Sequence, residues 1–232
     1  MKKSRVLYAS MKKQEKILGI IWLVIQVFLG YLVTLANDFL PHKLDDKLLD
    51  FATIAVNFLA IICIFGNFLK DSLATAFRKL WEILQAVILG CVFYCACDWA
   101  LGKGLSLFLP NYRPLVDTGI AALSDGNRYL LVLGAVVLIP VIEEVLYRGL
   151  IFRNLWRKKK VVAYILSMLV FAAIHVYGYV GSQDITTLAL CFVRYLPAGL
   201  CLAWTYAKAD NIFAPILVHA IINAVSIGIL NT

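Results

Sequence analysis

Two adjacent glutamates and an arginine stand inside an apolar stretch of the chain, in the segment EEVLYR (residues 143–148). Residues four apart share one face of a helix, so Glu144 and Arg148 can form an ion pair. Glu143 is rotated by about 100° from Glu144 and must face a different neighbour. A purely structural ion pair explains Glu144 and Arg148 but gives Glu143 no task. Glu143 is therefore the first candidate for chemistry.

Further polar residues interrupt other apolar stretches. His175 ends the run FAAIH, His219 and Asn223 enclose the run HAIIN, and Arg194 lies midway along a third run. Such groups cost at least ~2.5 kcal/mol when charged inside a bilayer, and there they usually mark a working site. Purely structural roles stay open for each of them. His175 can simply pack, and His219 and Asn223 can hold helices together by hydrogen bonds. Arg194 can serve as a structural counter-ion.

The chemistry that these groups can perform is hydrolysis. A carboxylate facing an imidazole can hold and deprotonate a water molecule, and a second imidazole and an amide can donate to a developing oxyanion. We assign Glu143 as the base, a water positioned with His175 as the nucleophile, and His219 and Asn223 as oxyanion donors. No serine or cysteine has an evident base partner in the sequence, so a covalent mechanism is less attractive.

The composition indicates which solvent surrounds these residues. Of the 232 residues, 62% are hydrophobic and 16% are charged, and the mean hydropathy is +0.84. A soluble domain is about 45–50% apolar and about 25% charged. The composition therefore excludes a soluble enzyme, a disordered tail and a nucleic-acid-binding module. For the same reason the net charge of +8 does not indicate binding of nucleic acid. The lipid bilayer is the expected surrounding.

Seven apolar segments are long enough to cross a bilayer, which takes about 20 residues. They cover residues 17–36, 51–69, 81–101, 129–156, 161–180, 185–207 and 211–230. The sequence therefore predicts an all-α, polytopic membrane helix bundle with about seven transmembrane helices. The outer loop 102–128 could hide an eighth. The first apolar run is longer than that of a cleaved signal peptide, so we expect it to be a retained span.

We expect one structural unit made of two parts. Residues 1–124 form an N-terminal region of three spans with an outer loop, and residues 125–232 form a core that holds the polar groups. The six cysteines all lie in apolar stretches and lack the spacing of a zinc site. They are expected to be small buried thiols rather than a disulfide framework.

Lysine and arginine indicate the orientation, because they collect on the cytoplasmic side of membrane proteins. With a cytoplasmic N-terminus, the outer connections hold five of the 22 basic residues. The inner segments hold fifteen, namely Lys2, Lys3, Arg5, Lys12, Lys13, Lys16, Lys70, Arg78, Lys79, Arg153, Arg157, Lys158, Lys159, Lys160 and Lys208. This bias predicts an N-terminus in the cytoplasm and a C-terminus outside.

The rise of a helix brings the polar groups to one depth. Glu143, His175 and Asn223 lie 14, 15 and 15 residues from basic residues that mark the inner boundary of their spans. At about 1.5 Å per residue, these counts correspond to similar depths, so Glu143 and His175 should face one another across a helical hairpin. Pro140 should loosen the helix there, because its ring blocks the hydrogen bond to Val136.

At these residues the sequence resembles a known family. EEVLYR fits EExxxR, FAAIH fits FxxxH and HAIIN fits HxxxN, the motifs of the CPBP intramembrane proteases. These include CAAX proteases and bacteriocin-processing enzymes and are also called the Abi family. The resemblance covers about residues 125–230 and implies a glutamate-dependent endopeptidase on a helical membrane core. It assigns to the site Glu143, Glu144, Arg148, His175, His219 and Asn223.

The resemblance leaves the question of a metal open. The family has also been described as metalloproteases, and Glu143, His175 and His219 provide the ligand types of a His₂Glu zinc site. The HExxH spacing of many such sites is absent, and the structurally studied relatives imply a metal-free glutamate mechanism. We therefore expect no metal and no other cofactor, with zinc as the alternative.

The expected function is that of an intramembrane endopeptidase acting on a peptide or a membrane protein. The size and the basic N-terminus are typical of a bacterial protein, so we expect the protein to lie in a bacterial cell membrane. The bacterial members of the family imply a role in peptide maturation or bacteriocin self-immunity. CAAX cleavage in the strict sense needs prenylated substrates and is not expected there. The sequence predicts neither the substrate nor the oligomeric state.

Two other functions stay open at this point. One is a non-catalytic immunity or regulatory protein that binds a bacteriocin or another membrane partner. The other is a proton-coupled transporter that relays protons through Glu143 and His175. Transporters usually show internal symmetry and broken helix pairs, which the sequence does not display.

Reporter fusions test the predicted orientation. A reporter after Thr232 should lie outside the cell, and one between Lys158 and Lys160 should lie in the cytoplasm, because connections rich in lysine and arginine stay inside. Alkaline phosphatase and a fluorescent protein report the two sides. A cytoplasmic reporter after Thr232 would mean an even number of spans, with the loop 102–128 as the place of the unrecognised one.

Overall fold

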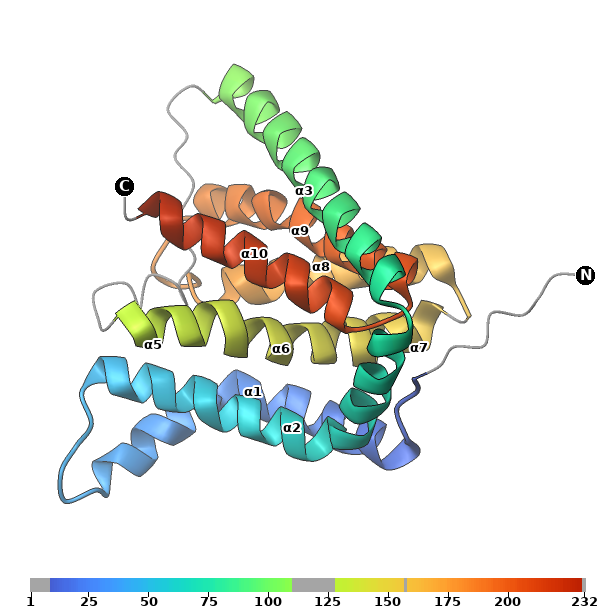
Figure 1. Cartoon of the computed structure of the whole chain (residues 1–232). Helices are drawn as coiled ribbons and strands as arrows, with labels where there is room; N and C mark the ends of the chain where they lie inside the picture. Colours follow the sequence, from blue (N-terminus) through green and yellow to red (C-terminus); the bar gives the residue numbers. More distant parts are fainter. Residues whose placement is uncertain (1–8, 110–127, 157, 231–232) are drawn as a thin grey trace, which may run out of the picture.

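The structure, a computed structural model, describes residues 9–109, 128–156 and 158–230. Within these ranges the chain forms seven helical rods and no strand. Six of the rods are α1 (Lys13–Asp38), α2 (Asp46–Arg78), α3 (Leu80–Phe108), α8 (Lys160–Tyr177), α9 (Ile185–Ala209) and α10 (Phe213–Leu230) (Figure 1). The fourth rod, residues 128–156, is a series of shorter helices. The prediction of an all-α, polytopic membrane helix bundle is confirmed.

Apolar side chains cover much of the outside of this bundle. Helices α1, α2, α3, α8 and α9 are long and apolar enough to cross a membrane. Large apolar side chains such as those of Phe28, Phe77 and Trp99 are exposed on their surfaces. A soluble monomer rarely exposes so much contiguous apolar surface, whereas the hydrocarbon of a bilayer accepts it. The protein is therefore a multi-pass membrane protein.

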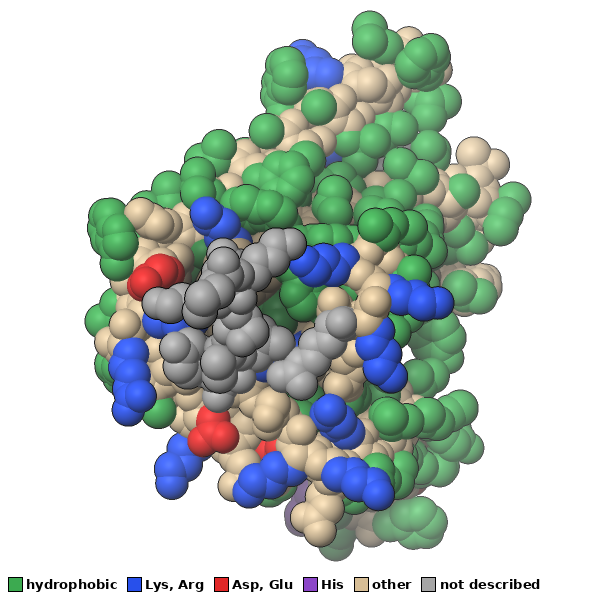
Figure 2. All heavy atoms as spheres, turned by 90° about the vertical axis from the view of Figure 1, so that its right-hand side faces the viewer, with side chains coloured by type: hydrophobic (Ala, Val, Ile, Leu, Met, Phe, Trp, Pro, Cys, Tyr) green, Lys and Arg blue, Asp and Glu red, His purple; other side chains and the backbone are tan. Residues whose placement is uncertain are grey.

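The connections that were predicted to lie inside gather at one end of the bundle. The start of α1, the α2–α3 turn, the link before α8 and the α9–α10 turn lie together there, and α10 ends at the opposite end (Figure 1). Seen from this end, lysine and arginine side chains surround the face (Figure 2). Exposed examples are Lys12, Lys70, Arg78, Lys158 and Lys208. Which end faces the cytoplasm stays a prediction.

The fourth rod becomes π-helical twice. Its segments are α5 (Arg128–Val132), η1 (Leu133–Leu138), α6 (Ile139–Glu144), η2 (Val145–Phe152) and α7 (Arg153–Trp156), and the two η segments are π-helical. In a π-helix each amide bonds the carbonyl five residues back instead of four. The wider turns rotate the side chains that follow, so they help to set the direction in which Glu143 and Glu144 point.

Pro140 loosens this rod, but not at the predicted carbonyl. The amide of Ile139 bonds the oxygen of Gly134, five residues back. In the same register the oxygen of Ala135 would need the amide of residue 140, and proline has no amide hydrogen. The carbonyl left over is therefore that of Ala135 and not that of Val136, because the prediction of Val136 assumed α-helical spacing.

Two helices extend well past the predicted ends of their spans. Helix α2 continues to Arg78 instead of ending near residue 69, and α3 continues to Phe108 instead of residue 101. Helix α2 kinks at Phe65, where φ is −107° and ψ is 19°. Three residues later the amide of Phe68 donates to the buried carboxylate of Glu15 at 2.9 Å, which ties α1 to the kink. The remainder of the expected outer loop, residues 110–127, lies outside the described residues.

The buried core joins both predicted parts of the chain. Ile61 and Phe65 of α2 share one apolar cluster with Leu146 and Phe152 of the fourth rod and with Leu202 of α9. The division near residue 124 stays a prediction.

The cysteines are free thiols, but not all of them are buried. Cys191 and Cys201 are buried, whereas Cys63 and Cys95 are exposed on the helix surfaces. Burial was predicted for all six because they lie in apolar stretches. In a membrane bundle, however, an apolar stretch also has a face that contacts lipid.

Helices α8 and α9 pack closely at a glycine. A Cβ atom added at Gly199 would lie 2.9 Å from the Cα atom of Met168. Small residues let helix backbones approach in membranes, where van der Waals packing drives association. Gly199 thus sets the distance between α8, which carries His175, and α9.

Replacement of this glycine should destabilise the bundle. We expect Gly199→Ala to lower the free energy of unfolding by ~1–3 kcal/mol, the usual cost of overpacking, measured as thermal unfolding in detergent. Gly30→Ala in α1 is the matched control, because no atom lies within 4 Å of the added Cβ there and alanine favours helix. Equal melting temperatures for Gly199→Ala and the parent protein would contradict the close packing.

Candidate active site

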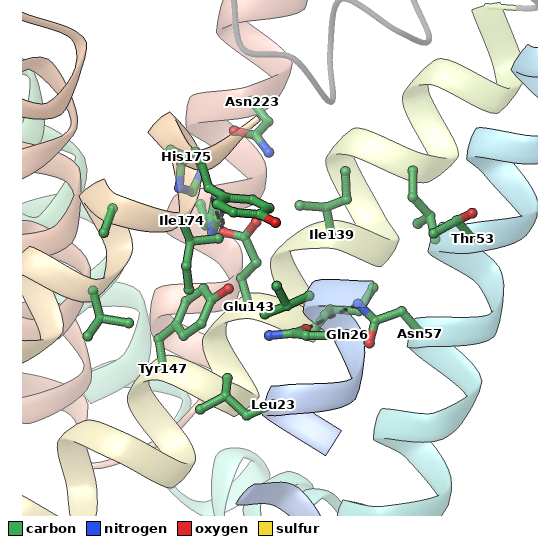
Figure 3. Close-up of a pocket in the computed structure, with 17 residues that line it drawn as sticks. Leu23, Gln26, Thr53, Asn57, Ile139, Glu143, Tyr147, Ile174, His175 and Asn223 are labelled. Carbon is green, nitrogen blue, oxygen red and sulfur yellow. Dashed lines mark hydrogen bonds and ion pairs between the residues drawn. The ribbon is translucent and has the colours of Figure 1, made fainter. Parts of the chain in front are cut away.

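A cavity of about 550 Å³ lies between α1, α2, α6, α8 and α10 (Figure 3). Apolar side chains such as Leu23, Ile54, Ile139 and Ile174 form most of its lining. Its polar lining residues are Gln26, Thr53, Asn57, Glu143, Tyr147, His175, Tyr177, His219 and Asn223. A mostly apolar cavity with a few convergent polar groups is typical of a ligand site. The four residues predicted to be catalytic all line it.

The Glu143 carboxylate lies between two imidazole rings. Its Oε2 atom is 3.7 Å from Nε2 of His175 and 3.9 Å from Nε2 of His219. The three side chains are 15%, 9% and 4% exposed, respectively. These separations leave all three atoms within reach of one bound water molecule. The equal depth inferred from residue counts thus corresponds to actual proximity of Glu143 and His175.

The ring of His175 is oriented by its own helix. Its Nδ1 atom is 2.9 Å from the carbonyl oxygen of Phe171, and a carbonyl can only accept, so Nδ1 carries a hydrogen. In the neutral ring, Nε2 then presents a lone pair toward Glu143. The ring also packs on Phe171 and Tyr195, with centroid distances of 4.2 and 4.5 Å. His175 is therefore placed to accept a hydrogen bond from a water that Glu143 also binds.

Glu144 joins two of the motifs across the bundle. Its Oε1 atom is 2.8 Å from a terminal nitrogen of Arg148 and 2.9 Å from Nδ1 of His219. The ion pair with Arg148 follows from four-residue spacing and was predicted. The contact with His219 was not predicted, because no sequence pattern relates two side chains 75 residues apart.

This contact also limits what His219 can donate. The carboxylate of Glu144 accepts from Nδ1, so the neutral ring has no hydrogen on Nε2. His219 can donate from Nε2 to an oxyanion only when both ring nitrogens are protonated. Glu143, Glu144 and Arg148 together carry one net negative charge when ionised, and the protonated ring would balance it.

Arg148 is completely buried and is held by contacts with two other helices. Besides Glu144, it donates to the carbonyl oxygen of Gly199 at 3.1 Å, and its guanidinium carbon lies 4.5 Å from the ring centroid of Phe171. A buried charge is tolerated only when it is paired and hydrogen-bonded. Arg148 therefore fixes the fourth rod against α8 and α9 and sets the position of Glu144.

Asn223 bonds the carbonyl that Pro140 leaves without an amide. Its Nδ2 atom donates to the oxygen of Ala135 at 2.8 Å. The interhelical hydrogen bond that the sequence left open as a structural role is therefore present. A primary amide has two hydrogens, so the second one can still serve a molecule in the cavity, which Asn223 lines near His175 (Figure 3).

Arg194 lies outside this site. It pairs with Asp98 of α3 at 2.8 Å and also donates to the Asp98 carbonyl. This is the structural counter-ion role that its position in an apolar span suggested, although the sequence did not identify the partner.

The geometry of the side chains also bears on the possibility of a bound metal. Within the ranges that the structure describes, no group of three or more His, Cys, Asp or Glu side chains is spaced to hold a metal ion. Nδ1 of each histidine in the site is engaged in a hydrogen bond. Metal independence stays a prediction.

Sequence reasoning missed the part of the site that comes from the N-terminal region. Gln26 of α1, Thr53 and Asn57 of α2, and Tyr147 of η2 line the cavity. The available signal was the amide side chains of Gln26 and Asn57, which interrupt the first two apolar runs. They match no motif, and their shared position depends on how α1 and α2 pack on the fourth rod.

Comparison with known proteins finds similarity in the part of the chain that holds these residues. Residues 125–225 match the family model of type II CAAX prenyl endopeptidase Rce1-like proteins. The chain is 29% identical over 176 residues to the UPF0177 protein YxdF of Lactococcus lactis subsp. lactis (strain IL1403), an alignment that covers 74% of this chain and 89% of that protein. No solved structure shows significant similarity to the chain. Residues 125–225, which hold all six of the predicted site residues, are thus similar to the type II CAAX prenyl endopeptidases, consistent with the resemblance to the CPBP intramembrane proteases.

Proposed function

We propose that the protein is an intramembrane endopeptidase that hydrolyses a peptide bond with a water molecule activated by Glu143. The observation that supports this most is the position of Glu143 Oε2, within 4 Å of Nε2 of both His175 and His219 at the wall of the cavity. A base, a second acceptor for the water and donors for an oxyanion are the groups that such a hydrolysis requires.

The reaction follows from the hydrogen positions. A water between Glu143 and His175 donates one hydrogen to the carboxylate and the other to the lone pair of Nε2. As its oxygen attacks the substrate carbonyl, one proton passes to Glu143. The oxyanion that forms accepts from Nε2 of protonated His219 and from the second amide hydrogen of Asn223. Glu143 then returns the proton to the leaving amine, the C–N bond breaks, and a carboxylic acid and an amine result.

We further propose that no metal takes part, that the substrate is a peptide or a membrane protein, and that the protein works in a bacterial cell membrane. The relative in Lactococcus lactis supports a bacterial setting. Peptide maturation or bacteriocin self-immunity is the role that we infer from the family. Strict CAAX cleavage is not proposed, because it requires prenylated substrates.

The Glu143→Gln variant tests the base. Glutamine keeps the shape of the side chain but cannot accept the proton, so we expect a folded protein whose peptide cleavage is lower by roughly 10²–10⁴-fold. Purified protein in detergent or liposomes is assayed with a pool of quenched fluorescent peptides. Glu82→Gln is a matched control, because Glu82 is an exposed glutamate in the first turn of α3, away from the site.

The other functions appear as distinct outcomes of the same assay. Cleavage by Glu143→Gln at the parental rate would exclude Glu143 as the base. Host protection against a bacteriocin that survives Glu143→Gln would favour a non-catalytic immunity protein. Loss of cleavage on treatment with a zinc chelator, and its return with added zinc, would overturn the metal-free mechanism.

Asn223 has a structural contact and a proposed catalytic one, and Asn223→Ala separates them. Loss of an oxyanion donor should lower kcat by ~10²-fold or more. Loss of the bond to the Ala135 carbonyl should also lower stability by ~1–3 kcal/mol, seen as a lower melting temperature in detergent. Rates are therefore compared per folded molecule. A folded Asn223→Ala protein with normal turnover would leave Asn223 with its structural role alone.

A further inference from the structure

A chain of polar side chains crosses from α1 and α2 to the fourth rod. Nε1 of Trp22 is 2.7 Å from Oδ1 of Asn57, and Nδ2 of Asn57 is 3.3 Å from Oε1 of Gln26. The amide nitrogen of Gln26 points toward Tyr147 (Figure 3), which places it to donate to the Tyr147 hydroxyl. Except for Trp22, these residues line the cavity.

Trp22, the first of these side chains, sets the direction of the hydrogen bonds between them. An indole nitrogen can only donate, so Asn57 must accept through its amide oxygen and turn its nitrogen toward Gln26. Gln26 must then accept through its oxygen, and only its nitrogen remains for Tyr147. In this arrangement the oxygen of Tyr147 can only accept from Gln26, which leaves its own hydrogen to point elsewhere.

The surroundings of Tyr147 indicate where that hydrogen points. Tyr147 follows Glu143 by four residues, so the two side chains share one face of the rod, and Figure 3 shows the hydroxyl on the side of the Glu143 carboxylate. The ring is buried and held edge-on by Phe171, with centroids 6.2 Å apart. Tyr147 also lines the cavity.

We propose that the Tyr147 hydroxyl donates a hydrogen bond to the Glu143 carboxylate, and that Gln26, Asn57 and Trp22 enforce this direction. Tyr147 is then a positioning residue: it holds the carboxylate toward His175 and His219. A carboxylate side chain has several rotatable bonds, and an error of about 1 Å in a reacting group can cost 10²-fold in rate. The N-terminal helices thereby become part of the active site. The proposal rests on the proposed peptidase function.

Tyr147→Phe tests the donor, because phenylalanine keeps the packing on Phe171 and removes only the hydroxyl. We expect kcat to fall by roughly tenfold or more with KM within about twofold, because the substrate is still bound but the base is less well held. Tyr164→Phe is the matched control. Tyr164 is a half-buried tyrosine of α8 that packs on Phe152 and Trp156, and its substitution should leave both constants unchanged.

A substitution of Gln26 tests the direction of these hydrogen bonds. Gln26→Glu keeps the size of the side chain but can only accept when ionised, so it should turn the Tyr147 hydrogen away from Glu143. We expect it to lower kcat about as much as Tyr147→Phe does. The double variant Gln26→Glu with Tyr147→Phe should be no slower than Tyr147→Phe alone, because Gln26 acts through the hydroxyl.

Each outcome of these assays, run with the quenched peptide pool, decides the proposal. Normal kcat in folded Tyr147→Phe overturns it while leaving the peptidase function intact. If the fold-reductions in kcat of the two single variants multiply in the double variant, the proposal is overturned, because Gln26 would then act independently of the Tyr147 hydroxyl. A loss that matches the loss of folded protein in detergent overturns the positioning role in favour of a structural one. If the parent protein itself cleaves no peptide, the proposed function fails first, and the proposal fails with it.

Discussion

The buried contact of Glu144 with Arg148 and His219 is the interaction on which the site depends. A guanidinium and a carboxylate removed from water each carry a desolvation cost of several kcal/mol, which is offset only by good geometry and further hydrogen bonds. Arg148 meets this condition through the Gly199 carbonyl and the face of Phe171. The same contacts join the fourth rod to α8, α9 and α10. The need to pair and hydrogen-bond these buried charges therefore fixes the relative positions of the helices that carry the proposed catalytic groups.

A second constraint comes from the bilayer, in which each backbone polar group needs a partner inside the protein. Pro140 lies three residues before Glu143 and breaks the hydrogen-bond ladder there. The π-helical turn moves the gap to Ala135, and the amide of Asn223 fills it. The HxxxN motif thus has a structural reason that is independent of any reaction. A membrane enzyme can use one side chain for both tasks, because an amide has two hydrogens.

The predictions from sequence were most accurate where they depended on local rules. Apolar runs predicted the helices, four-residue spacing predicted the Glu144–Arg148 pair, and residue counts along α8 and the fourth rod predicted that His175 faces Glu143. They were less accurate where geometry departs from the ideal helix. The extensions of α2 and α3, the π-helical turns and the register at Ala135 have no simple sequence pattern. The roles of the site residues in catalysis stay predictions.

The sequence alone determined the membrane setting, the helical fold, the motifs and the depth at which their polar residues lie, because hydropathy and helix rise are properties of short segments. Only the tertiary structure decided which groups meet. It joins His219 to Glu144, Asn223 to Ala135, and Gln26 to the wall of the same cavity. These contacts connect segments 75 or more residues apart, and their existence depends on helix rotation and packing. A rotation of one residue, about 100°, would turn any of these side chains away from its partner.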